Sequence, residues 1–341
     1  HEEPASLAKE LVERLPSHPS GDEWVVHFVN SGSEAVDLAA QMAMVYTGRP
    51  EMIGLHKGYH GLHGYAAGLT AIGKAEQPCY SSMFSSTSHV SPNNIEQLED
   101  HLKYTTGGKV AGFIAEPLQG YGGIIPLEDG YMKEAFNMVK EAGGITISDE
   151  VQTGYGRTGE SFWGFQNKHN DVIPDMITMA KGIANGFPLS ACITTTEIAD
   201  ALVKNTISTF GGNPVSCVAA IKTIEIIERD KLANNSMKMG AVLRDGLDAL
   251  KEKYPKFAGD VRGKGLMQAI EFVVDEPDGD RTPNPEVVDK LMEETKKRGL
   301  LIGRGGLTGN IVRISPSLNI IQNDVEKALE ILDDSLSVMT N

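Results

Sequence analysis

Asp149, Lys181 and the string Asn-Ser-Gly-Ser-Glu at residues 30–34 each follow a short apolar run. A lysine amine can bond covalently to an aldehyde, and the amides that open a helix can bind a phosphate. An acid beside these two groups completes what a phosphorylated aldehyde cofactor such as pyridoxal phosphate requires. The first question is whether the chain brings these groups to one place.

The elements around these residues predict that it does. From Trp24 onward short apolar strands alternate with helical patterns, at Trp24–Val29, Met52–Leu55, Val110–Glu116, Ile145–Glu150 and Met176–Ala180. Such alternation predicts an α/β fold with a mostly parallel sheet covered on both faces, whose ligands bind at the carboxyl ends of the strands. We therefore expect Asp149, Lys181 and residues 30–34 at one rim, with Lys181 buried there and its pKa lowered by burial.

The helix that should follow residues 30–34 carries an apolar stripe from Ala35 to Tyr46. Its predicted N-cap is Ser31 or Ser33, and Gly48 is its predicted stop. A cap at this position would point the first amides of the helix at the expected rim.

The chain changes style after about residue 232, where a long helix, two strands, a polar loop and further helices predict a smaller α+β domain. We expect an N-terminal helical segment at residues 1–22, a large cofactor-binding domain at 23–231 and a small C-terminal domain at 232–341. The chain starts at His1 inside a plausible helix, so we expect it to be part of a longer protein whose targeting signal cannot be read here.

Composition excludes several classes of partner. The net charge of −15 argues against nucleic acid, which needs a basic face, and no apolar run approaches the roughly 20 residues that span a bilayer. The three cysteines, Cys79, Cys192 and Cys217, are odd in number and widely spaced, so neither a disulfide framework nor a zinc pattern is expected. A reducing compartment is the expectation for such isolated cysteines.

Residues 154–159 read Gly-Tyr-Gly-Arg-Thr-Gly and match the dinucleotide-binding spacing G-x-G-x-x-G. In that fold a helix opens at the third glycine, whereas here the aromatic, glycine-broken string Glu-Ser-Phe-Trp-Gly-Phe follows. The match is an accident of a glycine-rich chain, and a dehydrogenase is disfavoured.

Eight strings carry a family resemblance, in this order: NSGSEA, GYHG, AEPLQG, SDEVQTGYGRTG, TMAKGIANGFP, STFGGNP, GDVRGKGLM and VRISPSL. Together they resemble the class III aminotransferases of pyridoxal-phosphate fold type I, over nearly the whole chain. TMAKGIANGFP, GDVRGKGL and GLLIGRGG are most similar to the alanine–glyoxylate branch of that family. The resemblance implies a seven-stranded-type, mostly parallel sheet in the large domain and an α+β small domain.

The resemblance implies a role for each matching residue. Lys181 would hold the cofactor aldehyde covalently and later move a proton at the substrate α-carbon. Asp149 would pair with the pyridine nitrogen and keep it protonated. Val151 would pack under the ring, Tyr59 would stack on its opposite face, and Gln152 would hydrogen-bond the 3′ oxygen. Taken alone, a strand-end lysine or a core tyrosine would be unremarkable.

The phosphate would bind at the helix start, to Ser31, Gly32 and Ser33, although a plain helix cap explains these three equally well. Thr209 of STFGGNP would reach a phosphate held mainly by a partner subunit. The resemblance therefore implies a homodimer with shared active sites, a tetramer being the larger alternative.

Three histidines lie close together in the sequence, His56, His60 and His63, but a zinc site needs further ligands at matching spacing. We expect no metal, and expect His60 near the cofactor instead. Glu116 is expected to contact the cofactor region through hydrogen bonds.

Arg313 would bind the substrate α-carboxylate, because a guanidinium matches a carboxylate with two parallel hydrogen bonds. Relatives that act on ω-amino groups carry a glutamate five residues after the Glu116 position, which can pair with this arginine and set it aside. Here that position is Tyr121. The change favours small α-amino and α-keto acids.

The implied reaction moves an amino group from L-alanine, or a similar donor such as 3-aminoisobutyrate, to glyoxylate, giving pyruvate and glycine. Three alternatives stay open: a phospho-lyase acting on a phosphorylated amino alcohol, an ω-amino acid aminotransferase, and a scaffold that binds the cofactor without turnover. The resemblance implies a mitochondrial location, with the cytoplasm as the alternative.

Overall fold

A computed structural model describes residues 2–72, 86–202, 207–275 and 281–339. The chain forms two compact units. The first unit holds residues 1–117, 127–155 and 161–230, and the second unit holds 118–126, 156–160 and 231–341. The two short excursions, 118–126 and 156–160, belong to the second unit although the surrounding sequence belongs to the first.

The first unit is built on a seven-stranded sheet in the order β1-β9-β8-β7-β4-β2-β3. Its strands are β1 (Trp24–Val29), β2 (Glu51–Leu55), β3 (Thr87–Val90), β4 (Val110–Ala115), β7 (Ile145–Asp149), β8 (Met176–Met179) and β9 (Ser190–Thr195). β9 runs antiparallel to both of its neighbours, and the other pairings are parallel. β1, β7 and β8 therefore end at the same edge, and the predicted fold class is confirmed.

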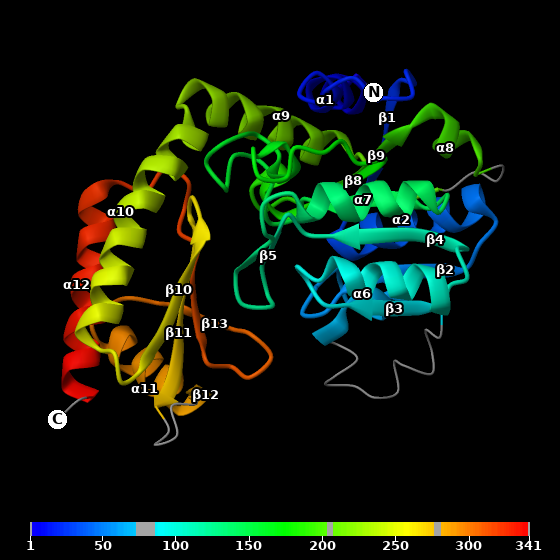
Figure 1. Cartoon of the computed structure of the whole chain (residues 1–341). Coiled ribbons are helices and arrows are strands. Elements are labelled where there is room, and N and C mark those ends of the chain that lie inside the picture. The colour runs from blue at the N-terminus through cyan, green and yellow to red at the C-terminus, as the bar shows by residue number, and fades with distance from the viewer. Residues whose placement is uncertain (1, 73–85, 203–206, 276–280, 340–341) are drawn as a thin grey trace. The chain divides into compact units, whose positions relative to one another are not determined.

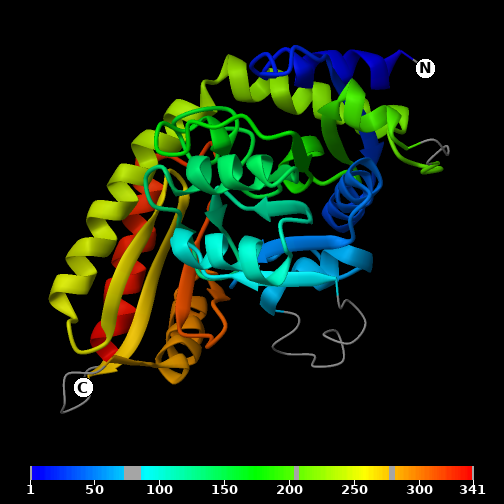
Figure 2. The ribbon, with the colours of Figure 1, turned by 45° about the vertical axis from the view of Figure 1, so that its right-hand side comes forward.

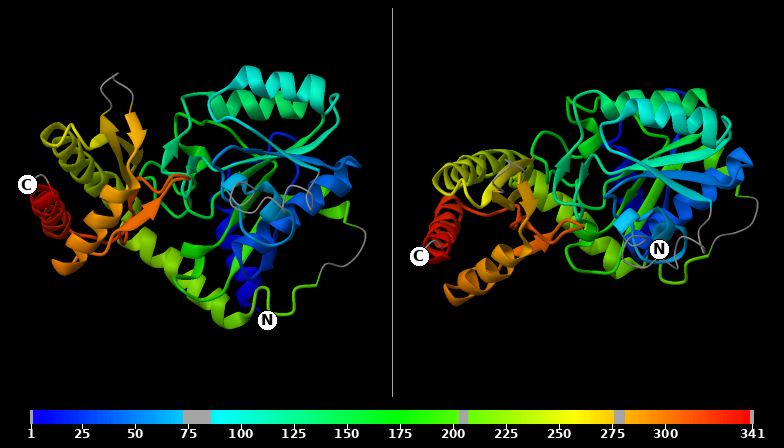
Figure 3. Two further views of the ribbon diagram at one scale, coloured as in Figure 1. Left: turned by 90° about the horizontal axis from the view of Figure 1, so that it is seen from below. Right: turned by 60° about the horizontal axis from the view of Figure 1, so that its bottom comes forward.

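Helices cover both faces of this sheet (Figure 1). On one face lie α6 (Ile95–Asp100) and α7 (Tyr131–Glu141), and α2 (Gly32–Thr47) lies on the other, as the view from below also shows (Figure 3). The remaining helical elements of the first unit are α1 (Glu3–Val12), α3 (Gly64–Leu69), η1 (His101–Thr105), η2 (Gly164–Gln166), η3 (Lys181–Ala184), α8 (Thr196–Asp200) and α9 (Pro214–Arg229). α1 runs alongside α9 (Figure 2).

The structure chooses between the two predicted N-caps of α2 and confirms its predicted stop. The N-cap is Ser31, in extended backbone, whose hydroxyl accepts the Glu34 amide while the Glu34 carboxylate accepts the Ser31 amide. Ser33 lies in the first turn instead. Gly48 ends the helix at φ 66°, a left-handed conformation that glycine adopts without steric cost.

Burial explains which strands were predicted. β4, β7 and β8 are buried along their whole length and read as continuous apolar runs, as strands covered on both faces do. β3 (Thr-Ser-His-Val) and β9 (Ser-Ala-Cys-Ile-Thr-Thr) were not predicted, because small and hydroxyl side chains fill their buried positions. Thr194 and Thr195 are buried in β9 all the same.

The second unit has an antiparallel sheet in the order β10-β11-β14-β13, with β12 added on β11. Its elements are β10 (Ala258–Lys264), β11 (Met267–Asp275), β12 (Arg281–Pro283), β13 (Gly303–Gly305), β14 (Ile311–Ile314), α10 (Leu232–Lys253), α11 (Pro285–Lys297), α12 (Gln322–Met339) and the small hairpin of β5 (Leu118–Gln119) and β6 (Ile125–Pro126). The three helices pack around an apolar core that includes Leu247, Phe272 and Leu332.

None of the helices described is long and apolar enough to cross a membrane. Within the same residues, no three His, Cys, Asp or Glu side chains are placed to hold a metal ion.

Candidate active site

A cavity of about 340 Å³ lies in the first unit at the edge where β1, β7 and β8 end. Its lining comes from the start of α2, the loop before α3, the end of β7 and the segment after β8. The lining residues are Asn30, Ser31, Gly32, Ser33, Tyr59, His60, Gly61, Asp149, Val151, Ala180, Lys181, Gly186, Phe187, Pro188 and Leu189. The structure thus brings together the three groups that were expected at one rim.

The start of α2 reaches this edge because residue 32 is glycine. A Cβ on Gly32 would lie 3.3 Å from Cγ2 of Val151 and 3.5 Å from Cβ of Ala180. A larger residue would therefore push the helix away from the ends of β7 and β8. The hydroxyl of Ser33 accepts the amide of Leu62 at 3.3 Å, which joins the helix start to the loop before α3. The first-turn amides of α2 have no partner within the helix.

Asp149 ends β7 with its side chain only 3% exposed. One carboxylate oxygen accepts the amide of Val151 at 3.1 Å, and the other lies 2.7 Å from Nδ1 of His60. The His60 side chain is fully buried, and its Nε2 has no hydrogen-bond partner among the described residues. A buried polar atom without a partner is costly, and each such atom calls for an explanation.

Burial alone would lower the pKa of His60. The hydrogen bond to Asp149 and the negative charges of Asp149 and Glu116 outweigh that effect, and the pKa of His60 is raised above its ordinary value. A protonated His60 donates a charge-assisted hydrogen bond to Asp149 and fixes the orientation of its carboxylate.

Tyr59 and Val151 both line the cavity and are half-buried. Glu116, buried at the end of β4, accepts the backbone amide of Tyr59 at 3.0 Å and so fixes the loop that carries this ring. Glu116 acts on the loop and is not part of the lining.

Lys181 is exposed in this structure, so the expected burial among strand ends is wrong for the chain by itself. The reason lies in the backbone: Lys181 begins the turn η3 with φ 45°, which carries its side chain to the cavity mouth. Ile183 and Ala184 are buried, and residues 185–188 are exposed again, with Phe187 50% exposed.

Besides Glu116, four predicted residues lie outside the lining. Gln152 is half-buried next to Val151, and Thr209 is exposed beyond Ser208, whose hydroxyl accepts the side-chain amide of Asn30 at 3.1 Å. Tyr121 and Arg313 belong to the second unit, where the guanidinium carbon of Arg313 lies 5.3 Å from the centre of the Tyr121 ring.

The sequence reasoning missed two contributors. Phe187 and Leu189 line the cavity, and the signal for them was their place in the block after Lys181. Glu150, the residue after Asp149, is fully buried, and its carboxylate accepts four hydrogen bonds, from Ser148, Thr153, Gly164 and Phe165. Its chemistry could not be read from the sequence, because those donors lie up to 15 residues away.

The residues present fit pyridoxal phosphate. The chemistry of the donor set supplies each group the cofactor needs: helix-start amides for the phosphate, a buried carboxylate for a protonated ring nitrogen, and an amine for the aldehyde. Tyr59 and Val151 offer an aromatic and an aliphatic surface to a flat ring. Asp149, held by His60, is the acid that the resemblance assigned to the ring nitrogen.

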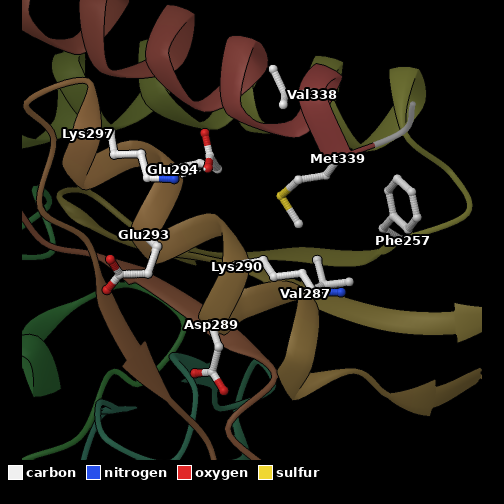
Figure 4. Close-up of a pocket in the computed structure, with 9 residues that line it drawn as sticks. All are labelled: Phe257, Val287, Asp289, Lys290, Glu293, Glu294, Lys297, Val338 and Met339. Atoms are coloured by element: carbon white, nitrogen blue, oxygen red, sulfur yellow. Dashed lines mark hydrogen bonds and ion pairs between the residues drawn. The ribbon is translucent and has the colours of Figure 1, made fainter.

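A second cavity, of about 740 Å³, lies in the second unit between α11 and the end of α12 (Figure 4). It is larger, yet its rim is a mixture of acidic and basic side chains, with Lys297 paired to Glu294 at 2.6 Å. Apolar side chains such as Phe257 and Met339 form its floor. The candidate chemistry belongs to the smaller cavity of the first unit.

The fold and the site together define a pyridoxal-phosphate-dependent transferase. Residues 1–336 match the family Aminotransferase class-III, and the chain belongs to this family. It is an enzyme of the transaminase type that uses pyridoxal phosphate, which confirms the resemblance and the expected cofactor.

Sequence relatives narrow the comparison. The chain is 42% identical to "Alanine--glyoxylate aminotransferase 2 homolog 2, mitochondrial" of Arabidopsis thaliana, covering 98% of this chain and 70% of that protein. It is 39% identical to "Alanine--glyoxylate aminotransferase 2, mitochondrial" of Homo sapiens, covering 92% of this chain and 67% of that protein. An alanine/serine racemase of Pyrococcus horikoshii is 33% identical, covering 97% of this chain and 72% of that protein, so the family includes other reactions.

Solved structures agree on the fold. An aminotransferase of Bacillus anthracis is 33% identical with a TM-score of 0.87, covering 99% of this chain and 80% of that one. A phospholyase from Arthrobacter, solved with phosphoethanolamine, is 29% identical with a TM-score of 0.88, covering 99% of this chain and 82% of that one.

Proposed function

We propose that this enzyme transfers the amino group of L-alanine, or of a similar small donor such as 3-aminoisobutyrate, to glyoxylate, giving pyruvate and glycine. The observation that carries the proposal is the stacking of Tyr121 on Arg313. The names of the two alanine–glyoxylate relatives support the same substrate pair.

The polar residues that line the cavity have distinct tasks in this proposal. Lys181 Nζ would hold the cofactor aldehyde. Once the substrate amine has replaced it there, the free amine would carry the proton between the substrate α-carbon and the cofactor C4′. Asp149 keeps the ring nitrogen protonated, and His60 fixes the orientation of the Asp149 carboxylate. The cofactor, when bound, accepts the electrons left at the α-carbon. Ser31, Gly32 and Ser33 bind its phosphate.

Arg313 binds the substrate carboxylate in this proposal. Its side chain passes over Gly305, where a Cβ would come within 2.5 Å of Cδ of Arg313, and its Nε donates to the carbonyl of Arg304 at 3.3 Å. The Tyr121 ring covers the guanidinium without neutralising it, because an aromatic face attracts a cation and carries no net charge. Arg313 thus stays cationic for α-carboxylates in both half reactions.

Tyr121 is itself held in place within the second unit. The amide of Gly306 donates to the Tyr121 carbonyl at 3.0 Å. In the same hairpin, Arg262 Nε donates to the carbonyl of Gly123 at 2.9 Å. The ring that covers Arg313 therefore sits on a braced turn.

The test of the reaction is an absorbance experiment on the protein loaded with pyridoxal phosphate. L-Alanine should bleach the visible cofactor band, and glyoxylate should restore it. A band that ignores alanine but responds to a phosphorylated amino alcohol, with release of phosphate and no need for a keto acid, would replace the proposal by the phospho-lyase. A band that responds to no amino compound would leave only the inert scaffold.

The test of the specificity argument is Tyr121→Glu, with Tyr121→Phe as the matched variant that keeps the ring. The new carboxylate should pair with Arg313 and shift the ratio of kcat/KM for 4-aminobutyrate over alanine upward by about tenfold or more. Tyr121→Phe should keep the ratio of the natural enzyme. If the natural enzyme already prefers 4-aminobutyrate, it is an ω-amino acid aminotransferase and the proposal is wrong.

We also propose a homodimer, with Thr209 reaching the phosphate held by the partner subunit. Large apolar side chains flank Thr209 in the first unit and are exposed: Ile207 by 84%, Phe210 by 72%, Val215 by 64% and Val218 by 54%. Light scattering should give twice the mass of the chain, or four times for a tetramer. Thr209→Ala should weaken cofactor binding without changing that mass, and a monomer that holds the cofactor fully would contradict the proposal.

We propose a mitochondrial location for the full-length protein, on the names of the relatives. Imaging of the natural protein against a mitochondrial marker tests this, and a cytoplasmic signal would overturn it.

A further inference from the structure

The turn that carries Lys181 is conformationally strained. Lys181 and Asn185, at its two ends, both have φ 45°, a left-handed conformation that a residue with a Cβ adopts at a cost. Such a turn persists only where its surroundings hold it.

Two kinds of support hold η3. From within, the amide of Ile183 donates to the carbonyl of Ala180 at 3.1 Å, and the Ile183 side chain is buried. From outside, the ring of Tyr155 lies against the residue next to the lysine: a Cβ on Gly182 would be 3.4 Å from Cδ2 of Tyr155, at van der Waals distance. The ring thus backs the Lys181–Gly182 peptide.

The Tyr155 ring is itself fixed. Tyr155 is 3% exposed and has φ 63°. Its ring packs edge to face on Phe162 and Trp163, with centroid distances of 5.5 and 5.4 Å. Aromatic rings in this arrangement form a stiff surface.

Glu150 ties this aromatic group to the sheet. Its carboxylate accepts the hydroxyl of Thr153 at 2.6 Å and the amide of Gly164 at 2.8 Å, and its carbonyl accepts the amide of Gly154 at 3.0 Å. The two ends of the loop that bears the three rings are thus bound to the residue after Asp149. Hydrogen bonds to Glu150 therefore connect the end of β7, which bears Asp149, to the aromatic group that lies against the Lys181 turn.

We propose that Tyr155 is a positioning residue, whose ring holds the Lys181 turn in the strained conformation that aims the amine at the cofactor. The inference rests on the proposed role of Lys181. It concerns the ring and not the hydroxyl, because the buried Tyr155 hydroxyl has no hydrogen-bond partner among the described residues. Phenylalanine should therefore serve as well as tyrosine.

The experiment compares Tyr155→Leu, Tyr155→Phe and Phe136→Leu in the full chain. Phe136 is an equally buried aromatic of the same unit that packs on Phe113, and it controls for a general loss of core packing. The measured quantity is the rate constant at which the cofactor band forms after pyridoxal phosphate is added. Amide hydrogen exchange of residues 178–187 without the cofactor is the second readout.

Tyr155→Leu should slow band formation by about tenfold or more, because a displaced reacting group loses rate steeply, and should speed exchange in residues 178–187. Tyr155→Phe should leave both the rate of band formation and the exchange at their natural values. Phe136→Leu should change only the melting temperature. Band formation at the natural rate in Tyr155→Leu, or equal slowing in Phe136→Leu, would overturn the inference.

Lys181→Ala separates this result from the proposed function. It should form no covalently attached cofactor, as judged by borohydride reduction and peptide mass. If the cofactor is still attached in Lys181→Ala, the proposed role of Lys181 is wrong whatever Tyr155 does. If Lys181→Ala behaves as expected and Tyr155→Leu is unaffected, only the positioning role is lost.

Discussion

The first unit contains two buried histidine–aspartate pairs. His60 and Asp149 lie 2.7 Å apart at the carboxyl end of β7, and His18 and Asp175 lie 3.2 Å apart just before β8 begins. Both pairs join distant parts of the chain, and all four side chains are at most 10% exposed. By composition alone they could not be told apart.

Their surroundings differ. Asp175 is saturated: besides His18 it meets Lys140 at 3.0 Å and accepts the amide and the hydroxyl of Thr146 at 2.9 and 2.7 Å. Asp149 lines a cavity, and the far nitrogen of its partner His60 has no hydrogen-bond partner among the described residues. A carboxylate whose oxygens are all occupied is suited to holding the fold, whereas the Asp149 carboxylate lines a cavity and is placed to meet a ligand.

The largest expected effect separates the two aspartates by activity. Asp149→Asn should lower kcat/KM for transamination by about 10²- to 10³-fold, because a neutral amide cannot keep the ring nitrogen protonated. Asp175→Asn should leave the activity per folded molecule unchanged. Steady-state kinetics on both variants, normalised to folded protein, tests the contrast, and equal losses would break it.

The second effect separates them by stability. Asp175→Asn should lower the free energy of unfolding by about 2–4 kcal/mol, because Lys140 and His18 lose the charge that they surround. Denaturant unfolding without added cofactor measures the change. A smaller loss than in Asp149→Asn would reverse the assignment of the structural pair.

A third prediction uses pH. The pKa of His60 is raised, so its contribution to stability is complete below about pH 6.5, its unfolded value, and is lost as the pH rises through the folded value. For Asp175, burial alone would raise the pKa, but the hydrogen bond from His18, the charge of Lys140 and the hydrogen bonds from Thr146 lower it. Its contribution is present above about pH 4 and is lost as the pH falls through the folded value.

Unfolding experiments across pH test these opposite signs. His60→Gln should remove part of the alkaline loss of stability and leave the acid side alone, and Asp175→Asn should do the reverse. An unchanged alkaline limb in His60→Gln would show that His60 does not bind its proton more tightly in the folded chain.

The smallest expected effect lies at the helix start beside the functional pair. Ser31→Ala removes the N-cap of α2 and should lower the free energy of unfolding by about 1 kcal/mol. It should also weaken cofactor binding, whereas Asn213→Ala, which removes the N-cap of α9, should cost similar stability and leave binding intact. Equal cofactor affinity in both variants would mean that the start of α2 does not bind the phosphate.

Much of this was open to prediction from local sequence. Asp149, Lys181 and Ser31 were placed at one edge because apolar runs, caps and the parallel order of strands are local signals with a fixed geometric consequence. Lys181 was expected to be buried, and it is exposed. The cause is the left-handed turn that it begins, and the sequence of that turn carries no signal for this conformation.

The sequence by itself determined the family, the α/β fold and the residues that can do chemistry, since these follow from the type and spacing of neighbours. Only the tertiary structure showed that His60 reaches Asp149 across 89 positions and that the Tyr155 ring lies against Gly182. It likewise placed Tyr121 over Arg313. Contacts between distant segments depend on how the whole chain packs, and no local pattern encodes that.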